Sequence, residues 1–114
     1  MTPEAKLIFK EVCKTLNMPE ESVLSKSHKA SIVDVRYLCV HFIKKYTENI
    51  PLNTIGVWFK RKGNGSAHSF AIYALRKTEM YRESDNEFKE KYRQCLNAFM
   101  FYNKSVNFNN IPQY

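Results

Sequence analysis

The sequence predicts an all-α domain of five or six helices built around a helix-turn-helix motif. Along most of the chain, apolar residues recur three, four and seven positions apart, which is the periodicity of amphipathic helices. No segment shows the strict alternation that is typical of a half-buried strand. Between residues 51 and 80, two helical patterns are separated by a short turn that contains glycine, and this layout is typical of a helix-turn-helix.

The first helix is predicted from a start signal at Thr2, whose hydroxyl can cap a helix. Pro3 follows, and proline suits a first turn because its missing N–H would have no partner there. The helix should end near residue 16, and one short helical turn should follow between Pro19 and Leu24. The expected buried stripe consists of Leu7, Ile8, Val12 and Leu16.

A long central helix is predicted over residues 30–47, after a polar and basic connector at residues 25–29. Apolar side chains occur on so many sides of this helix that it should be the most buried one. Arg36 and Lys44 interrupt its apolar surface two turns apart. The connector reads SKSHK, in which the serines can cap a helix or reach phosphates and the lysines supply positive charge.

The predicted helix-turn-helix spans residues 51–80. Leu52, Ile55 and Phe59 share one face of its first helix because they lie at i, i+3 and i+7. The turn that follows is basic and contains two glycines, which adopt a positive φ that does not continue a helix. Ser66 can cap the second helix, the candidate reader of DNA. Its expected buried face consists of Ala71, Ala74, Leu75 and Thr78.

The last helix is predicted from residues 84–87, which read SDNE and match a capping box ahead of an apolar run. The apolar residues of this run recur at helical spacing and are Phe88, Tyr92, Cys95 and Phe99. From about Asn103 the sequence has no helical period. We therefore expect one folded domain over residues 1–102 and a flexible tail over residues 103–114.

The length of 114 residues fits one domain that buries a core without disulfides or metals. No segment approaches the ~20 apolar residues of a membrane span, and the first residues lack a secretory signal. We therefore expect a cytoplasmic protein without membrane contact. Three widely spaced cysteines lie in apolar helical patterns, and we expect Cys13, Cys39 and Cys95 to be buried and reduced.

Positive charge is concentrated in the middle of the chain. The net charge is +7, yet residues 22–77 alone carry +8, from ten Lys or Arg and two acids. Because this segment includes the helix-turn-helix, we expect a polyanion as partner, with double-stranded DNA first. We expect Lys60, Arg61 and Lys62 to clamp phosphates, since adjacent like charges repel without a counter-charge. The alternative is a solvated turn.

No catalytic or cofactor constellation is recognisable in the sequence. Residues 63–65 read GNG and lack the lysine and hydroxyl of a phosphate-binding loop, so we expect no nucleotide binding. No Cys/His cluster has zinc spacing, and the three histidines lie far apart without an evident nucleophile. We therefore expect a protein that is not an enzyme and that needs no cofactor or metal.

Two stretches of the chain, SKSHKASIVDVRYLCVHFIKKYT and PLNTIGVWFKRKGNGSAHSFAIYALRK, carry a family resemblance. They resemble the patterns SKSRKR, IVxARQIAMYLxRELT and SLPEIGxxFGGRDHTTVxHAxRKI of the C-terminal DNA-binding domain of the bacterial replication initiator DnaA. Ile55, Gly56 and Phe59 match directly. The resemblance covers roughly residues 7–100, by pattern and order more than by identity.

The resemblance implies an all-α fold related to the Trp-repressor type of helix-turn-helix, and binding to short double-stranded boxes at replication origins. It implies that Lys26, Arg36 and Lys44 contact phosphates. It also implies that residue 28 enters the minor groove and that residues 66–70 read the major groove. The residues expected to contact DNA are therefore Lys26, His28, Lys29, Arg36, Lys44, Lys60, Arg61, Lys62, Ser66, His68, Ser69 and Phe70.

Several positions that read bases in the family differ in this chain. His28 replaces an arginine, Ser66 and Ala67 replace an arginine and an aspartate, and Phe70 replaces a threonine. The turn is also about four residues longer and more basic. We therefore expect a bacterial or phage protein that binds DNA without reading the usual origin box. Because these 114 residues do not include the ATPase part of the initiators, we expect a role in replication initiation or in its regulation and not initiation by this chain alone.

Alternatives remain for three side chains and for the whole protein. His68 either bonds a base or is a solvated first-turn residue, and Phe70 either contacts DNA or packs in the core. Arg36 either contacts a phosphate or forms a core salt bridge with Asp34 or a more distant acid. The alternative function is an adaptor that binds a replication or transcription protein through Phe70, Tyr73 and the last helix. A third possibility is RNA binding.

Overall fold

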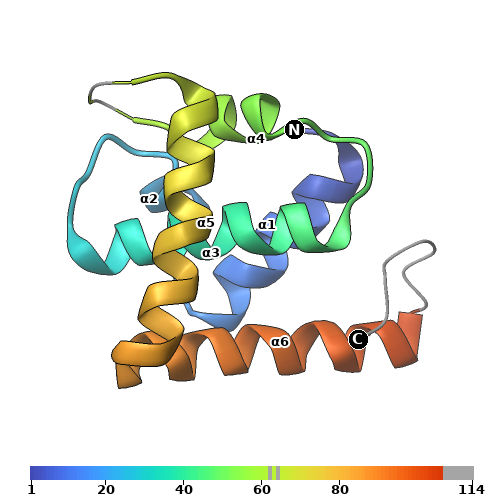
Figure 1. Cartoon of the computed structure of the whole chain (residues 1–114). Coiled ribbons are helices and arrows are strands. Elements are labelled where there is room, and N and C mark those ends of the chain that lie inside the picture. The colour runs from blue at the N-terminus through green and yellow to red at the C-terminus, as the bar shows by residue number, and fades with distance from the viewer. Residues whose placement is uncertain (62, 64, 107–114) are drawn as a thin grey trace.

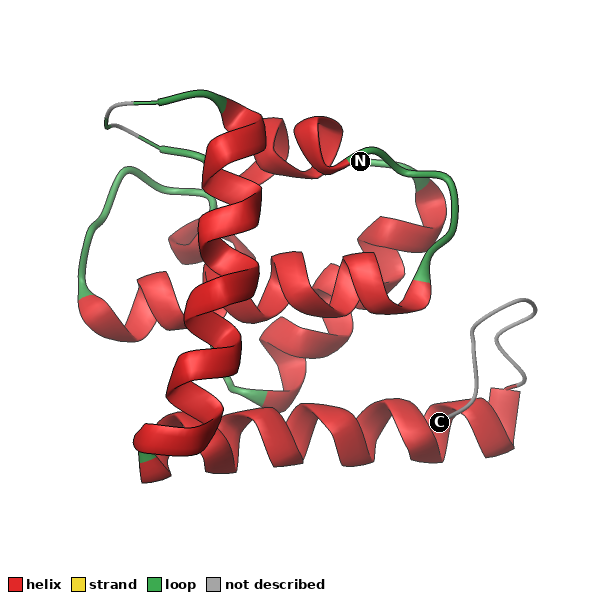
Figure 2. Ribbon diagram, in the orientation of Figure 1, coloured by secondary structure: helices red, strands yellow, loops and turns green. Residues whose placement is uncertain are grey.

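The described chain folds into six α-helices and contains no strand (Figures 1 and 2), which confirms the predicted fold class. The computed structural model describes residues 1–61, 63 and 65–106, with side chains to residue 101. The helices are α1 (Pro3–Thr15), α2 (Glu20–Val23), α3 (Ala30–Tyr46), α4 (Leu52–Phe59), α5 (Ala67–Ser84) and α6 (Asn86–Val106).

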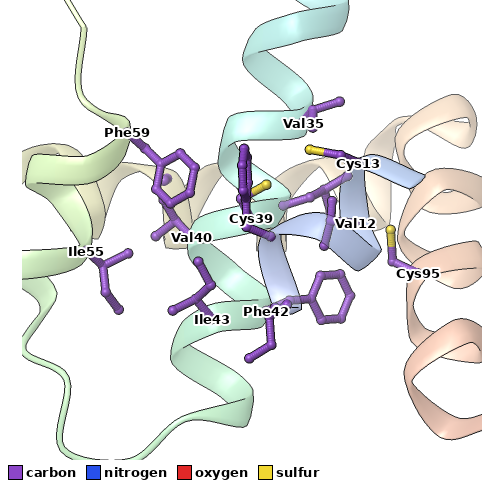
Figure 3. Packing of buried hydrophobic residues seen from close by; sticks show 14 of the residues in the cluster. Val12, Cys13, Val35, Cys39, Val40, Phe42, Ile43, Ile55, Phe59 and Cys95 are labelled. Carbon is purple, nitrogen blue, oxygen red and sulfur yellow. The ribbon is translucent and has the colours of Figure 1, made fainter. Parts of the chain in front are cut away.

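Helix α3 forms the centre of the molecule, as predicted. It packs against α1, α2, α4 and α5, and it has more buried residues than any other helix in the described part of the chain. Figure 3 shows its Cys39, Phe42 and Ile43 surrounded by side chains from neighbouring helices. A helix that is apolar on most sides is stable only when other helices cover those sides. The remaining helices are therefore arranged around α3.

Helices α4 and α5 form the helix-turn-helix, and glycine is required where they approach each other. Gly56 is buried, and a Cβ atom added there would lie 2.0 Å from the carbonyl oxygen of Ala67. Ala71 and Ala74 are fully buried, as predicted, and their small side chains let α5 pack closely on its neighbours. Leu75 of the same predicted face is only half-buried. Helix α5 then runs from the turn to α6 at the opposite end of the molecule (Figure 1).

Two of the predicted helix caps are present. The hydroxyl of Thr2 accepts a hydrogen bond of 3.2 Å from the amide of Ala5 at the start of α1. The hydroxyl of Ser66 accepts one of 3.0 Å from the amide of Ser69 at the start of α5. Each cap satisfies an N–H group that has no partner inside the helix, and so fixes the residue at which the helix begins.

The capping box predicted at the start of α6 had Ser84 as its capping residue, and this prediction is wrong. The carboxylate of Asp85, and not the hydroxyl of Ser84, accepts from the amides of Glu87 and Phe88, at 3.0 and 3.2 Å. Ser84 is the last residue of α5, and its hydroxyl donates to the carbonyl oxygen of Met80 at 2.8 Å. A serine in a last turn bonds backward along its own helix, so it cannot also cap the next one.

Two further expectations need correction. Leu7 is 49% exposed, because the buried face of α1 lies to one side of the predicted stripe. That face consists of Ala5, Ile8, Phe9, Val12 and Cys13. Helix α6 continues to Val106, so residues 103–106 are helical where a tail was expected. The rest of the expected tail lies outside the described residues.

Candidate nucleic-acid interface

Three segments that are separate in the sequence come together at one end of the molecule (Figure 1). They are the connector (residues 25–29) between α2 and α3, the basic turn (residues 60–66) between α4 and α5, and the first turn of α5. They line a cavity of about 400 Å³. Its lining residues from these segments are His28, Lys60, Arg61, Ser69 and Phe70. The other lining residues are Val33, Arg36, Tyr37, Phe59 and Tyr73.

The connector is held in a non-helical conformation by its own serines. The amide of Ser27 donates to the hydroxyl of Ser25, and the amide of Lys29 donates to the hydroxyl of Ser27, both at 3.2 Å. Such side-chain bonds replace the backbone bonds that a helix would supply. The side chains of Lys26, His28 and Lys29 are exposed. The fold therefore presents all three connector residues of the expected site to solvent.

Arg36 is buried, a position that does not suit the phosphate contact that the family resemblance implied. It is only 3% exposed, and its guanidinium donates to three backbone carbonyls instead of facing solvent. The acceptors are the carbonyl oxygens of Val23 at 2.7 Å, Ser25 at 2.6 Å and Ser27 at 2.6 Å. Arg36 thus fixes the connector from the inside, and the expected phosphate contact is replaced by this structural role.

The alternative, a salt bridge of Arg36 with Asp34 or a more distant acid, is not found among the described residues. Asp34 pairs instead with Lys91 of α6, at 3.6 Å. Burial raises the pKa of Asp34 above its ordinary value, and the positive charge of Lys91 partly opposes that rise. Asp34, two residues before Arg36, therefore links α3 to α6, whereas Arg36 bonds to the backbone of the connector.

Arg61 reaches the same connector from the basic turn. Its Nε donates to the carbonyl oxygens of Leu24 at 3.0 Å and Ser25 at 3.2 Å, and Nη1 donates to that of Lys60 at 2.9 Å. Arg36 and Arg61 therefore share the carbonyl of Ser25. Burial lowers the pKa of Arg36 below its ordinary value, and the positive charge of Arg61 lowers it further.

The basic turn folds back on its own backbone. Lys60 is half-buried, and its Nζ donates to the carbonyl oxygens of Arg61 at 3.3 Å and Gly63 at 3.2 Å. Gly63 and Gly65 have φ of 135° and 92°, so the turn needs glycine at both positions. Lys62, the third expected cation of this turn, lies outside the described residues.

The first turn of α5 presents short polar side chains to solvent. Ser66, His68 and Ser69 are all exposed. Phe70 is half-buried and packs against Tyr37 of α3, with ring centroids 6.4 Å apart. This contact agrees with the alternative that placed Phe70 against the core.

Tyr37 is not among the residues predicted from the sequence, although its ring contacts two side chains of α5. Besides Phe70 it packs edge-on against Tyr73, at a centroid distance of 6.0 Å. Burial raises the pKa of Tyr37 to about 12, so its phenol is neutral near pH 7. No local pattern marks this residue, because both contacts join it to residues far away in the sequence.

Lys44 lies apart from the other candidate residues. It is exposed near the end of α3, and its Nζ donates to the carbonyl oxygen of Ile50 at 3.3 Å. The helix rises 1.5 Å per residue, so Lys44 lies about 20 Å along α3 from its first residue, Ala30, which adjoins the connector. The structure therefore does not bring Lys44 together with the connector and the basic turn.

The described cations of the connector and the basic turn are not paired with acids in the described part of the chain. Within the described ranges, no Asp or Glu lies within 4.0 Å of Lys26, Lys29, Lys60 or Arg61. Ion pairs among the described residues are found instead on α3, α5 and α6. They are Arg82–Glu79, Lys91–Asp34 and Arg93–Glu90. The end of the molecule that carries the cavity therefore has uncompensated positive charge, which attracts anions.

The described residues show no other evident chemistry. No three His, Cys, Asp or Glu side chains among them are grouped so that they could hold a metal ion. No helix there is long and apolar enough to cross a membrane. Cys13, Cys39 and Cys95 are buried and form no disulfide, as predicted, and burial raises the pKa of Cys95 to about 12.

Comparison with known proteins identifies one family. The family described as bacterial dnaA protein helix-turn-helix matches residues 5–78. This range runs from α1 into α5 and so includes the connector, α4 and the basic turn.

Curated relatives match over a similar part of the chain. The chromosomal replication initiator protein DnaA of Mycoplasma genitalium is 33% identical over 85 residues, which is 74% of this chain and 18% of that protein. The protein of the same name from Mycoplasma pneumoniae is 31% identical over 84 residues, again 74% and 18%. That from Gloeobacter violaceus is 32% identical over 87 residues, 76% and 18%. The chain thus spans about a fifth of the length of these relatives, and no solved structure matches it.

Proposed function

The chain belongs to the bacterial DnaA helix-turn-helix family, and from that premise we propose that it binds double-stranded DNA without catalysing a reaction. The relatives are named chromosomal replication initiator proteins, which supports a role in replication initiation or its regulation. The chain corresponds to 18% of such an initiator. What this chain would contribute to replication initiation or its regulation is therefore DNA binding.

One observation supports this function best. The connector, the basic turn and the first turn of α5 converge around one cavity, and their described cations have no carboxylate partner. In helix-turn-helix proteins, the second helix enters the major groove and neighbouring loops contact the backbone. In this arrangement α5 would read bases, while the connector and the basic turn would hold phosphates on either side of it.

Each segment would have a distinct task. Ser66, His68 and Ser69 are exposed at the start of α5, where short polar side chains reach base edges. His28 would enter the neighbouring minor groove. The proposed phosphate contacts are Lys26, Lys29, Lys44, Lys60 and Lys62. Phe70 would act mainly by holding α5 against Tyr37, and the exposed part of its half-buried side chain would meet a thymine methyl group.

A fluorescence-anisotropy titration at two salt concentrations tests this proposal. The two probes are a duplex of random sequence and a duplex with the DnaA origin box. We expect equal binding to both, with the logarithm of affinity falling against the logarithm of salt by about 0.9 for each phosphate contacted. A preference for the box would mean that Ser66, Ala67 and His28 replace the family's base-reading residues. No binding at low salt would contradict the proposal.

Two variants locate the binding face. Lys26→Ala removes one exposed charge from the connector, and Lys89→Ala removes one exposed charge from α6, at the other end of the molecule. We expect Lys26→Ala to lower the salt slope by about 0.9 and Lys89→Ala to leave it unchanged, because only contacted phosphates release counterions. Equal effects of the two variants would mean that only overall charge matters.

The alternative function is that of an adaptor for a replication or transcription protein. Met100 and Phe101 are 46% and 72% exposed near the end of α6, so this helix offers apolar contacts away from the basic turn. An adaptor would form its complex equally well with Lys26→Ala, and it would not bind either duplex at low salt. The same titration therefore separates the two functions.

A further inference from the structure

We propose that Arg61 is a positioning residue that fastens the connector to the basic turn, so that both loops present a single DNA-binding surface. Its consequence for affinity rests on the proposed DNA binding. The fastening itself is a property of the free protein and is tested without DNA.

The hydrogen bonds of Arg61 join the two loops directly. One guanidinium reaches across to the carbonyls of Leu24 and Ser25 and back to that of Lys60 in its own turn. In the described part of the chain, the bond from Arg61 to Ser25 is the only hydrogen bond between the basic turn and the connector. Removing it would leave the two loops attached to different helices with no polar link between them.

Arg36 and Arg61 hold the connector from opposite sides. Arg36 extends from the buried face of α3 and donates to the carbonyls of Ser25 and Ser27. Arg61 approaches from the turn and shares the carbonyl of Ser25. Arg61 therefore adds a second set of bonds that hold the start of the connector, and it also fixes where the basic turn lies relative to the connector.

The geometry requires a guanidinium and not merely a positive charge. Arginine has five N–H donors in a planar fork, whereas lysine has a compact ammonium group on a flexible stem. Lysine at position 61 would keep the charge but could not maintain the same set of bonds to Leu24, Ser25 and Lys60. An arginine that served only as a phosphate contact would tolerate this change, so Arg61→Lys distinguishes the two roles.

Fixing the loops in advance would raise affinity for DNA. The connector carries Lys26, His28 and Lys29, and the turn carries Lys60. Binding with loops that are already ordered avoids part of the entropy loss on association. Loss of the bridge should therefore weaken binding while the number of phosphate contacts, and with it the salt slope, stays the same.

Two measurements on Arg61→Lys and Lys26→Ala test the proposal. The first is amide hydrogen exchange by NMR at Ser27 and Lys29 in the free protein, since both amides are hydrogen-bonded in the connector. For Arg61→Lys we expect exchange there to be at least about threefold faster, because local opening becomes easier. Lys26→Ala should leave exchange unchanged, because its exposed side chain makes no hydrogen bond with any described residue.

The second measurement is the salt titration of DNA binding. Arg61→Lys should weaken binding about tenfold at every salt concentration, the size expected for a lost charged hydrogen bond. Its salt slope should match wild type, whereas Lys26→Ala should lower the slope by about 0.9. Arg61→Gln, which keeps an N–H donor but no charge, serves as a second variant, and the exchange test applies to it equally.

Two results would overturn the proposal. One is wild-type exchange at Ser27 and Lys29 in both Arg61 variants, which would mean that the bridge does not hold the connector. The other is a reduced salt slope in Arg61→Lys with full affinity at low salt, which would make Arg61 a direct phosphate contact. If wild type binds no DNA, the proposed function fails, while the exchange result still decides whether Arg61 fastens the loops.

Discussion

At the scale of single residues, Arg36 shows that a buried charged side chain can hold the backbone of a loop in place. Its guanidinium donates to three backbone carbonyls, and among the described residues only that of Ser25 has a second donor, Arg61. Arg36→Met would leave the carbonyls of Val23 and Ser27 without their donor, so we expect a loss of about 2–4 kcal/mol of unfolding free energy.

Urea unfolding measures this loss, and Arg76→Met on the exposed surface of α5 is the matched control. The control should stay within about 0.5 kcal/mol of wild type, as surface substitutions usually do. Equal losses in the two variants would show that Arg36 contributes only its charge and its apolar stem.

His41 makes stability depend on pH. Its Nε2 lies 2.9 Å from the hydroxyl of Tyr92. Burial, assisted by Lys45 and Arg82, lowers the pKa of His41 from 6.5 to about 4. Below pH 6.5 the unfolded chain therefore takes up a proton that the folded protein excludes, and folding loses stability as pH falls from about 6.5 to about 4.

Unfolding free energies measured across this pH range test the role of His41. The lowered pKa accounts for at most about 3 kcal/mol of the loss, at 1.36 kcal/mol per pH unit. We expect His41→Gln to remove most of this dependence and His68→Gln, at an exposed site, to retain it. An unchanged pH profile in His41→Gln would mean that carboxyl groups dominate this range.

At the scale of elements, the contact between α4 and α5 depends on Gly56. An added methyl group would lie 2.0 Å from the carbonyl oxygen of Ala67, which belongs to the backbone and cannot move aside alone. We therefore expect Gly56→Ala to lower the unfolding free energy by about 3 kcal/mol or more. Val57→Ala, at a site that is 61% exposed on the same helix, should change it by less than about 0.5 kcal/mol. Similar unfolding midpoints in urea for the two variants would contradict this packing.

The start of α6 offers a test between two adjacent residues. The carboxylate of Asp85 caps the helix, whereas the hydroxyl of Ser84 bonds within α5. We expect Asp85→Ala to lose about 1 kcal/mol, the usual effect of removing a cap, and Ser84→Ala to lose less. Thermal unfolding monitored by circular dichroism compares them, and the reverse order would restore the capping box that the sequence predicted.

Helix starts could be predicted well where one capping residue stands alone, as at Thr2 and Ser66. They could not where two candidates are adjacent, as at Ser84 and Asp85, because the choice depends on where α5 ends. The rotation of α1 was equally ambiguous, since Leu7 continues the apolar pattern as well as its neighbours do. Local periodicity identifies a helix more reliably than the face that tertiary contacts will cover.

At the scale of the whole molecule, charge is divided between two ends. Cations without acidic partners surround the cavity beside the basic turn, while the described ion pairs lie on α3, α5 and α6. Sequence alone predicts this division, because residues 22–77 carry +8 and the rest of the chain −1. A protein with such a field attracts polyanions to one end.

The sequence does not predict which cations at that end are available to contact an anion. Arg36 and Arg61 look like phosphate contacts in the sequence, but both donate to backbone carbonyls near the connector. Those partners lie at least nine residues away along the chain, so only the folded structure brings them together. Lys26 and Lys29 are exposed in the connector, so their charges lie where an anion can reach them.

The most direct test of the account is an NMR titration of the labelled protein with a short random-sequence duplex at low salt. We predict shift changes at the amides of residues 25–29, 60, 61 and 66–70, with those of residues 86–96 unchanged. Such a result would place DNA on the end of the molecule that carries the basic turn. Changes confined to α6, or none at all, would contradict DNA binding through this helix-turn-helix.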